Sequence, residues 1–485
     1  MFKNITTTTM EDLITKAYRP ETFRAEAHQL VELLATELEK AHTAPQKKDT
    51  INWESPAEQL AYWQNDFNSP LIDSPLGLFR SVMSRSVNLH SRGYIGHQTS
   101  TTLPVTALTS ALISFLNNGM AVYEMGMAGN AMEKVVTAYM AAKFGFDEDA
   151  SGIVTSGGTL GNLTALLAAR AAMPNVLGKP EYGQLAIMVS EEAHYSIERA
   201  VRIMGLPPEN IIKISVNDRF QMRTELLEDQ YRDATAKGKK VFCIVGCACS
   251  TSIGAYDDLD AIGQFAQKQG IWFHVDGAHG APVIFSPVYK HLLRGIEKAD
   301  SVMVDFHKMM MAPSLSTAIL FKSARQAGKT FLQKAEYLWQ DQQADEWYNS
   351  GKQTFECTKS MTILHTYTIM RLYGDSLYRQ HIDKLYGMAQ EFARMVHQHE
   401  NFELACEPQS NIVCFRLKAG AESNDLNRDV LQRLIEDGRF YIVGTTIKKD
   451  FYLRITLMNP LTQKDDLEQL LQVIEDLAMS NAVIG

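Results

Sequence analysis

The chain has 485 residues, 45% hydrophobic and 21% charged, which is typical of a folded globular protein and excludes a disordered, collagen-like or coiled-coil chain. The length allows about three domains. The net charge is −9 without any basic block, so a nucleic-acid partner is not expected. No stretch reaches the roughly 18 apolar residues of a membrane span, and the first twenty residues lack a signal-peptide core, so no membrane partner is expected either.

The cysteines fit neither a paired zinc site nor a dense disulfide framework. The six positions are Cys243, Cys247, Cys249, Cys357, Cys406 and Cys414. Three of them fall in the apolar run VFCIVGCACS, where small core residues are expected. We therefore expect a reduced, cytoplasmic protein without a metal site.

In chain order, residues 1–75 are polar and interrupted by prolines, which predicts an N-terminal docking segment. The first clear helix follows in GNAMEKVVTAYMAAKFG, where apolar residues recur every three or four positions before Gly145. Its predicted apolar face consists of Met132, Val135, Val136, Tyr139 and Met140.

Short apolar runs then alternate with amphipathic stretches such as 160–172 and 258–269. The runs are 152–155, 185–189, 211–215, 241–246, 271–275, 301–304 and 317–321. Runs without polar alternation are typical of strands buried on both faces, so residues 76–380 are predicted to form an α/β domain with a mostly parallel sheet.

The pattern changes after about residue 380, where strands and helices no longer alternate regularly. The predicted strands are 411–417, 440–443 and 451–457, and the predicted helices are 427–437 and 465–479. Residues 381–485 are therefore expected to form a smaller α+β C-terminal domain.

Ligands of open α/β sheets bind at the carboxyl ends of the strands, so polar residues there carry functional weight. In TSGGTLGN, Gly157 and Gly158 let backbone approach an anion, and Thr159 adds a hydroxyl at a helix N-terminus. A phosphate loop and a simple glycine-rich turn are both consistent with this segment. The spacing is neither that of a dinucleotide fold nor that of a P-loop.

Three further strand ends carry candidate groups. Asp276 follows the strand in IWFHVDGAHGAP and is either a turn cap or a functional carboxylate. Lys308 lies among apolar residues in SVMVDFHKMMMAP, where desolvation would lower its pKa and make it a nucleophile. His194, in SEEAHYSIERA, is either structural or able to lie on an aromatic ring. Together, a phosphate loop, histidine, aspartate and lysine are the parts that pyridoxal phosphate requires.

These motifs resemble the group II pyridoxal-phosphate-dependent amino-acid decarboxylases, which include glutamate, aromatic amino acid and diaminobutyrate enzymes of the aspartate aminotransferase fold (fold type I). The resemblance covers about residues 75 to 460 and rests on TSGGTLGNLTALLAAR, AHYSIERA, HVDGAHGAP and DFHK. It implies that Lys308 is the internal aldimine lysine, that Asp276 pairs with the pyridine nitrogen and that His194 stacks on the ring. The other implied cofactor contacts are Ala278 on the opposite ring face, Gly158, Thr159 and His307 at the phosphate, and Ser250 and Thr251 in a hydroxyl-bearing turn.

The resemblance also implies a loop tyrosine that protonates the substrate carbon, with Tyr348 as the candidate and Tyr337 as an alternative. It further implies a homodimer. His279 stands where many relatives carry Trp or Tyr, so the substrate cannot be copied from a relative. Arg454 and Lys359 are candidates for holding a distal carboxylate.

The implied reaction is decarboxylation of an L-amino acid to an amine and CO2 through an aldimine at Lys308. The alternatives are another fold type I enzyme (a carbon–carbon lyase, an aminotransferase or a decarboxylation-coupled aldehyde former) and a non-catalytic protein that retains the fold. The presence of both Lys308 and Asp276 argues against the non-catalytic alternative.

Overall fold

The protein is described by a computed structural model covering residues 8–72, 74–173, 179–327, 331 and 346–480. Contacts divide the chain into two compact units. The larger unit comprises residues 96–427 and 443–460, and the smaller comprises residues 1–95, 428–442 and 461–485. The three segments predicted along the chain, 1–75, 76–380 and 381–485, stay a prediction.

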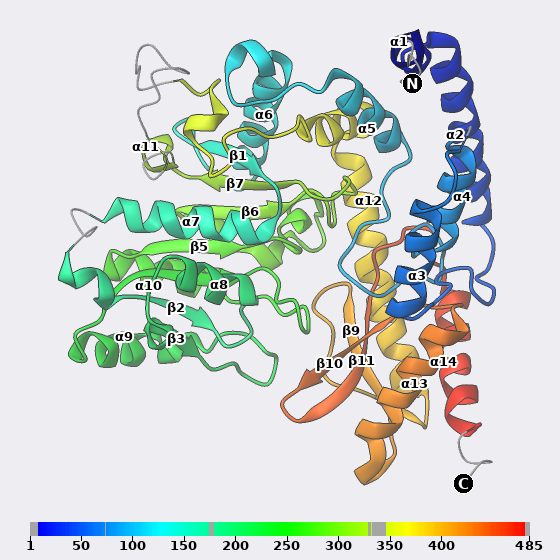
Figure 1. The fold of residues 1–485 in the computed structure, drawn as a ribbon. Helices are drawn as coiled ribbons and strands as arrows, with labels where there is room; N and C mark the ends of the chain where they lie inside the picture. Colours follow the sequence, from blue (N-terminus) through cyan, green and yellow to red (C-terminus); the bar gives the residue numbers. More distant parts are fainter. Residues whose placement is uncertain (1–7, 73, 174–178, 328–330, 332–345, 481–485) are drawn as a thin grey trace, which may run out of the picture. The chain divides into compact units, whose positions relative to one another are not determined.

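The larger unit contains a seven-stranded sheet with the order β1-β7-β6-β5-β4-β2-β3 (Figure 1). Its strands are β1 (Ser151–Thr155), β2 (Leu185–Ser190), β3 (Ile211–Ile214), β4 (Lys240–Cys247), β5 (Trp272–Asp276), β6 (Ser301–Asp305) and β7 (Thr317–Phe321). Every run predicted for this region forms a strand. Four of the six strand pairs are parallel and the two that involve β7 are antiparallel, so the predicted mostly parallel α/β fold of type I is confirmed.

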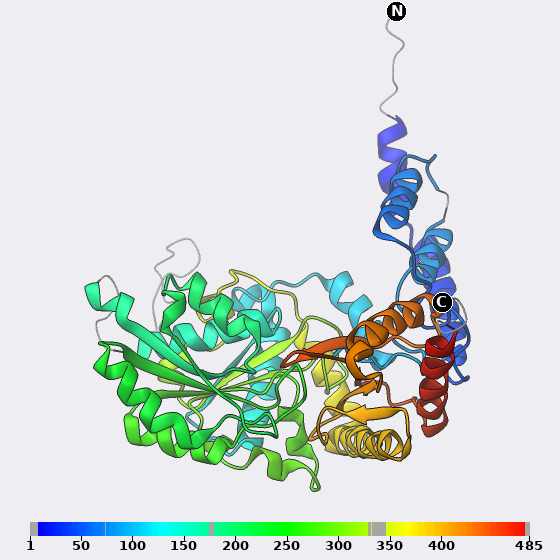
Figure 2. The ribbon, with the colours of Figure 1, turned by 90° about the horizontal axis from the view of Figure 1, so that it is seen from below.

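Helices cover both faces of this sheet, as Figures 1 and 2 show. The larger unit's helices are α5 (Val105–Leu116), α6 (Tyr123–Lys143), α7 (Gly158–Ala172), α8 (Tyr195–Ile203), α9 (Leu227–Ala236), α10 (Leu259–Gln269), α11 (Ala324–Ala327) and α12 (Ile363–Gln398). Val245 shares a core cluster with α7 and α8, whereas a Cβ on the adjacent Gly246 would lie 3.0 Å from Leu259 of α10. Successive strand residues point to opposite faces, so α10 lies on the face opposite α7 and α8.

Helix α6 buries a face different from the predicted one. Val136 and Met140 are buried as expected, but Val135 is 59% and Tyr139 is 39% exposed. The buried side includes Glu133, whose carboxylate accepts hydrogen bonds from the Val154 amide at 3.1 Å and the Lys359 ammonium at 2.6 Å. This pairing removes the cost of burying a charge, so a helix face that contains a glutamate can pack inward.

The larger unit also holds a four-stranded antiparallel sheet with the order β10-β11-β9-β8. Its strands are β8 (Phe402–Leu404), β9 (Ile412–Leu417), β10 (Val443–Ile447) and β11 (Asp450–Thr456). The predicted strand 440–443 is wrong, because the strand begins at Val443, where pairing with Arg454 starts. Phe440 and Ile442 are apolar because they are buried core residues outside that strand.

The smaller unit is helical. Its helices are α1 (Thr8–Ala17), α2 (Pro20–Lys40), α3 (Pro56–Phe67), α4 (Leu76–Ser84), α14 (Lys464–Met479) and most of α13 (Ser423–Asp437). Within it, the buried Arg92 guanidinium donates two 2.8 Å hydrogen bonds to Asp466 in the first turn of α14. None of the helices in the described part of the chain has the length and apolar character that a membrane crossing requires.

A close approach of two loops supports the end of β5. A Cβ on Gly280 would lie 2.7 Å from both the Ala248 carbonyl oxygen and the Cys249 nitrogen, which are backbone atoms just beyond β4. The Gly280 amide also donates to the Ala248 carbonyl at 3.0 Å. Only glycine allows this contact, which fixes the loop after Asp276.

We predict that Gly280→Ala lowers the free energy of unfolding by about 1–3 kcal/mol, because the added methyl group must displace backbone. Urea unfolding would measure the change. Gly183→Ala is the matched control, since no atom lies within 4 Å of its added Cβ. Equal stability of the two variants would contradict the prediction.

Candidate functional site

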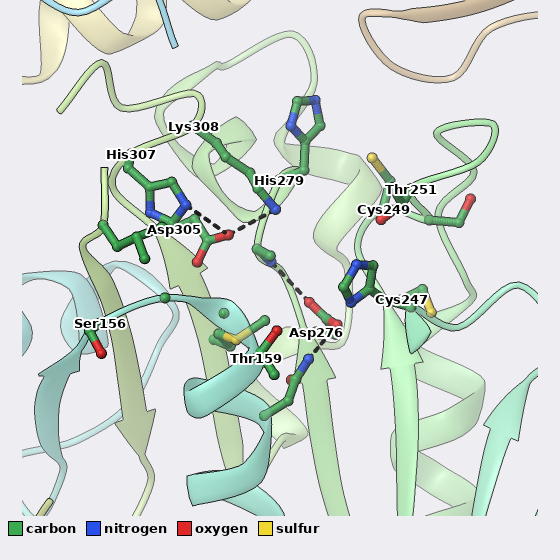
Figure 3. Close-up of a pocket in the computed structure, with 18 residues that line it drawn as sticks. Ser156, Thr159, Cys247, Cys249, Thr251, Asp276, His279, Asp305, His307 and Lys308 are labelled. Carbon is green, nitrogen blue, oxygen red and sulfur yellow. Dashed lines mark hydrogen bonds and ion pairs between the residues drawn. The ribbon is translucent and has the colours of Figure 1, made fainter. Parts of the chain in front are cut away.

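The carboxyl ends of β4, β5 and β6 and the start of α7 open onto one cavity of about 320 Å³ (Figure 3). The cavity is lined by Ser156, Gly157, Gly158, Thr159, Asn162, His194, Cys247, Cys249, Ser250, Thr251, Asp276, Ala278, His279, Met303, Asp305, His307, Lys308 and Leu315. All the cofactor-binding residues predicted from the sequence are among them.

The glycine-rich loop forms the N-terminus of α7. Gly157 has φ +115°, a conformation that L side chains rarely adopt, and α7 begins at Gly158. A Cβ on Gly158 would lie 3.3 Å from both carboxylate oxygens of Asp305. No side chain caps this helix, so its first-turn N–H groups and the positive end of its dipole suit an anionic group such as phosphate.

Lys308 is held as an ammonium by a residue that the sequence reasoning missed. Its Nζ lies 2.8 Å from Oδ2 of Asp305, the last residue of β6. Burial is the largest single effect and lowers the pKa of Lys308, but the charge and hydrogen bond of Asp305, together with the charge of Asp276, outweigh it, so the pKa is raised overall. The same pairing lowers the pKa of Asp305 against the effect of its own burial. The expectation that desolvation alone would lower the lysine pKa is therefore wrong. The sequence signal for this ion pair was the three-residue spacing between Asp305 and Lys308 in DFHK.

His307 borders the same carboxylate. Its Nδ1 lies 2.9 Å from the Ser316 carbonyl oxygen and 3.2 Å from the Ser316 nitrogen, and its Nε2 lies 3.8 Å from Oδ2 of Asp305. The ring is therefore anchored at one nitrogen and faces the cavity beside the glycine-rich loop.

Asp276 is oriented by a buried hydrogen-bond network. Asn162, one turn into α7, donates its amide to Oδ2 of Asp276 at 2.9 Å, and its own oxygen lies 2.9 Å from Nε2 of His274. The Ser301 hydroxyl, which accepts from the Trp272 indole, lies 2.8 Å from Nδ1 of His274. Since the Asn162 oxygen can only accept, Nε2 of His274 must carry the hydrogen. Burial lowers the pKa of His274 to about 4, so the ring is neutral.

The network reaches His194 through Ser196. Asn162 also donates to the Ser196 hydroxyl at 2.8 Å, and that hydroxyl lies 2.7 Å from Nδ1 of His194. Burial lowers the pKa of His194, with the nearby Asp276 opposing that effect. The histidine and the aspartate therefore share one positioning amide, Asn162. The sequence offered no signal for it beyond its place in TSGGTLGN.

Other predicted residues occupy different surroundings. The Ser250 hydroxyl accepts from the Ala255 amide at 3.1 Å, which gives it a structural task in the turn after β4. Tyr348 does not line the cavity and packs edge-on against Tyr123 of α6 with ring centroids 5.6 Å apart. Tyr337 lies outside the described residues. Its role and that of Tyr348 stay predictions.

Neither candidate for a distal carboxylate lines the cavity. The Lys359 ammonium forms an ion pair with the Glu133 carboxylate, with 2.6 Å between Nζ and Oε1. Arg454 is buried and donates to the Thr251 carbonyl at 2.7 Å, and burial lowers its pKa. Among the described residues that line the cavity, Lys308 is the only lysine or arginine.

The chain was compared with protein families, with individual proteins and with solved structures. Residues 81–418 match the family described as the pyridoxal-dependent decarboxylase conserved domain. Aromatic-L-amino-acid decarboxylase of Bacillus atrophaeus is 27% identical, over 75% of this chain and 77% of that protein. L-2,4-Diaminobutyrate decarboxylase of Acinetobacter baumannii is 28% identical over 80% of each chain. The crystal structure of mouse CSAD superposes with a TM-score of 0.87 at 25% identity and covers 95% of this chain and 99% of that chain.

The neutral, buried His274 makes stability depend on pH. Its pKa is about 4 in the folded protein against an ordinary value of 6.5, so only the unfolded chain takes up this proton between those values. Stability is therefore lost as pH falls through this window. We predict that His274→Gln, which keeps a donor and an acceptor, flattens the fall in unfolding free energy by about 1.4 kcal/mol per pH unit.

Urea unfolding of the wild type and the variant at several pH values between about 4 and 6.5 measures the two slopes. His291→Gln, which removes an exposed histidine, is the matched control. Parallel pH profiles for wild type and His274→Gln would refute the prediction.

Proposed function

This chain belongs to the family of pyridoxal-dependent decarboxylases and is a pyridoxal-phosphate-dependent carboxy-lyase acting on an amino acid; on that premise we propose which residues carry the reaction. The observation that carries the proposal is that Lys308, Asp276, His194 and the N-terminus of α7 open onto one cavity. The aminotransferase and carbon–carbon lyase alternatives are not favoured, because the relatives are decarboxylases.

The cavity suits pyridoxal phosphate. The uncapped α7 N-terminus would receive the phosphate, with Thr159 and His307, which line the cavity, as its side-chain contacts. His194 and Ala278 would cover the two faces of the ring. Lys308 would attach the cofactor covalently. The hydroxyls of Ser250 and Thr251 would border it.

When bound, the cofactor supplies an electron sink that accepts the electron pair left behind as the α-carboxylate departs as CO2. Asp276 would hold a proton on the pyridine nitrogen, which that sink requires. Asn162 supports this role, because its amide donates a hydrogen bond to Oδ2 and so fixes the position of the carboxylate. Tyr348 would deliver the proton that replaces the lost carboxylate and so direct the reaction to an amine.

We predict that Lys308→Ala abolishes the visible absorbance of the cofactor-loaded protein and lowers CO2 release about a thousandfold or more. The measurement is CO2 release from a panel of amino acids, with amine, aldehyde and ammonia quantified in parallel. Lys268→Ala, at an exposed lysine away from the cavity, is the control.

The wild type should form amine and CO2 in equal amounts from at least one amino acid. Aldehyde and ammonia without amine would overturn simple decarboxylation and the role given to Tyr348. A Lys308→Ala protein that retains both absorbance and activity would overturn the assignment of the lysine.

We also propose a homodimer that works in the cytoplasm. Three leucines of α5, Leu108, Leu112 and Leu116, are 61%, 47% and 44% exposed. The helix itself contains no charged residue. Apolar stripes of this kind mark protein–protein interfaces.

All six cysteines are free thiols, which supports the proposed location in the cytoplasm, a reducing compartment.

We predict that Leu108→Asp shifts the protein from dimer to monomer in sedimentation equilibrium, because a carboxylate would be desolvated in the interface. Val288→Asp introduces the same charge at another exposed apolar position, 57% exposed, and should leave the dimer intact. A wild-type monomer, or a dimeric Leu108→Asp protein, would contradict the assignment.

A further inference from the structure

His279 places a buried imidazole in the wall of the cavity. It lies three residues beyond the end of β5, is 1% exposed and lines the same cavity as Lys308. In the view of Figure 3, the Lys308 amine lies between Asp276 and the His279 ring. The lysine and the histidine line the same cavity.

The buried Asn411 amide determines which nitrogen of His279 carries the hydrogen. Its Nδ2 donates to the Leu457 carbonyl at 2.6 Å, and its Oδ1 lies 2.7 Å from Nε2 of His279. The reverse amide orientation would place two oxygens 2.6 Å apart without a hydrogen between them, so it is excluded.

An amide oxygen can only accept a hydrogen bond, so Nε2 of His279 must donate. Nδ1 then carries a lone pair and no hydrogen. This nitrogen is buried and has no hydrogen-bond partner among the described residues. A buried acceptor without a partner is costly, and the neighbouring cavity is the space from which a partner can come.

His279 is also unable to become a cation under ordinary conditions. Burial, followed by the charges of Lys308 and Arg454, lowers its pKa to about 3. The ring therefore remains an acceptor. It gives no favourable contact to a carboxylate, which has no hydrogen to donate.

Lys308 is not the missing partner, because its ammonium is turned to Asp305 at 2.8 Å. The substrate amine must come to the Lys308 position, while Asp276 and the glycine-rich loop bound the space proposed for the cofactor. The remainder of the substrate then extends past Lys308 toward His279. Its α-carboxylate cannot donate, so within the substrate the side chain is the part that can supply a donor to Nδ1.

We propose that Nδ1 of His279 accepts a hydrogen bond from the substrate side chain, so that the enzyme selects amino acids whose side chain carries a hydroxyl, ammonium, amide or ring N–H donor. The proposal rests on the decarboxylase function and names its substrate class. Among the described residues that line the cavity, the one lysine, Lys308, is already paired with Asp305, and none is an arginine.

The test compares near-isosteric amino acids that differ in the donor: tyrosine with phenylalanine, 2,4-diaminobutyrate with norvaline, and asparagine with aspartate. For each pair, kcat/KM for CO2 release and the dissociation constants of the product amines are measured on the cofactor-loaded enzyme. The wild type should prefer the donor-bearing member of its best pair by about tenfold or more. His279→Phe should reduce that preference to about twofold or less.

His279→Gln is the conservative control, because its amide can donate to Asn411 and keep an acceptor for the substrate. It should retain most of the preference, and it keeps the test decisive if the phenylalanine variant fails to fold. Equal or better use of the donor-lacking member by the wild type, or an unchanged preference in His279→Phe, would overturn the proposal and leave the decarboxylase function standing. Absence of CO2 release from every amino acid would instead refute the function on which it rests.

Discussion

Burial of the central strands on both faces is the constraint on which the site depends. Strands β5, β6 and β7 are buried along their whole length, so a charged side chain has no place within them except at an end. Asp276 and Asp305 are the last residues of β5 and β6. The parallel arrangement of these two strands brings both carboxylates to one edge of the sheet, where α7 begins. The charged side chains gather at this edge because the buried parts of the strands leave no place for them.

At that edge, two buried asparagines serve the same physical purpose. Asn162 contacts His274 and Asp276, and Asn411 contacts His279, in both cases with an amide whose oxygen faces an imidazole. An amide has a donor end and an acceptor end, so fixing its orientation fixes the tautomer of the histidine it meets. One asparagine supports the cofactor side of the cavity, and the other leaves a bare acceptor on His279, which lines the same cavity.

The sequence located the residues whose positions follow from strand periodicity. Lys308, Asp276, His194 and the glycine-rich loop could be placed together because each follows a predicted strand, and strand ends meet at one edge. The contacts between side chains could not be found in this way. Asn411 lies 132 residues from His279, and no local pattern links them. The start of β10 was also missed, because Phe440 and Ile442 are apolar for burial rather than for strand pairing.

The ion pair between Lys308 and Asp305 has a consequence for how the protein acquires its cofactor. An ammonium has no lone pair with which to attack a carbonyl, so the lysine must first give up a proton that its neighbour stabilises. Attachment of the cofactor at Lys308 would therefore begin with the transfer of that proton from the ammonium to a base, and Asp305, 2.8 Å away, is a carboxylate within reach.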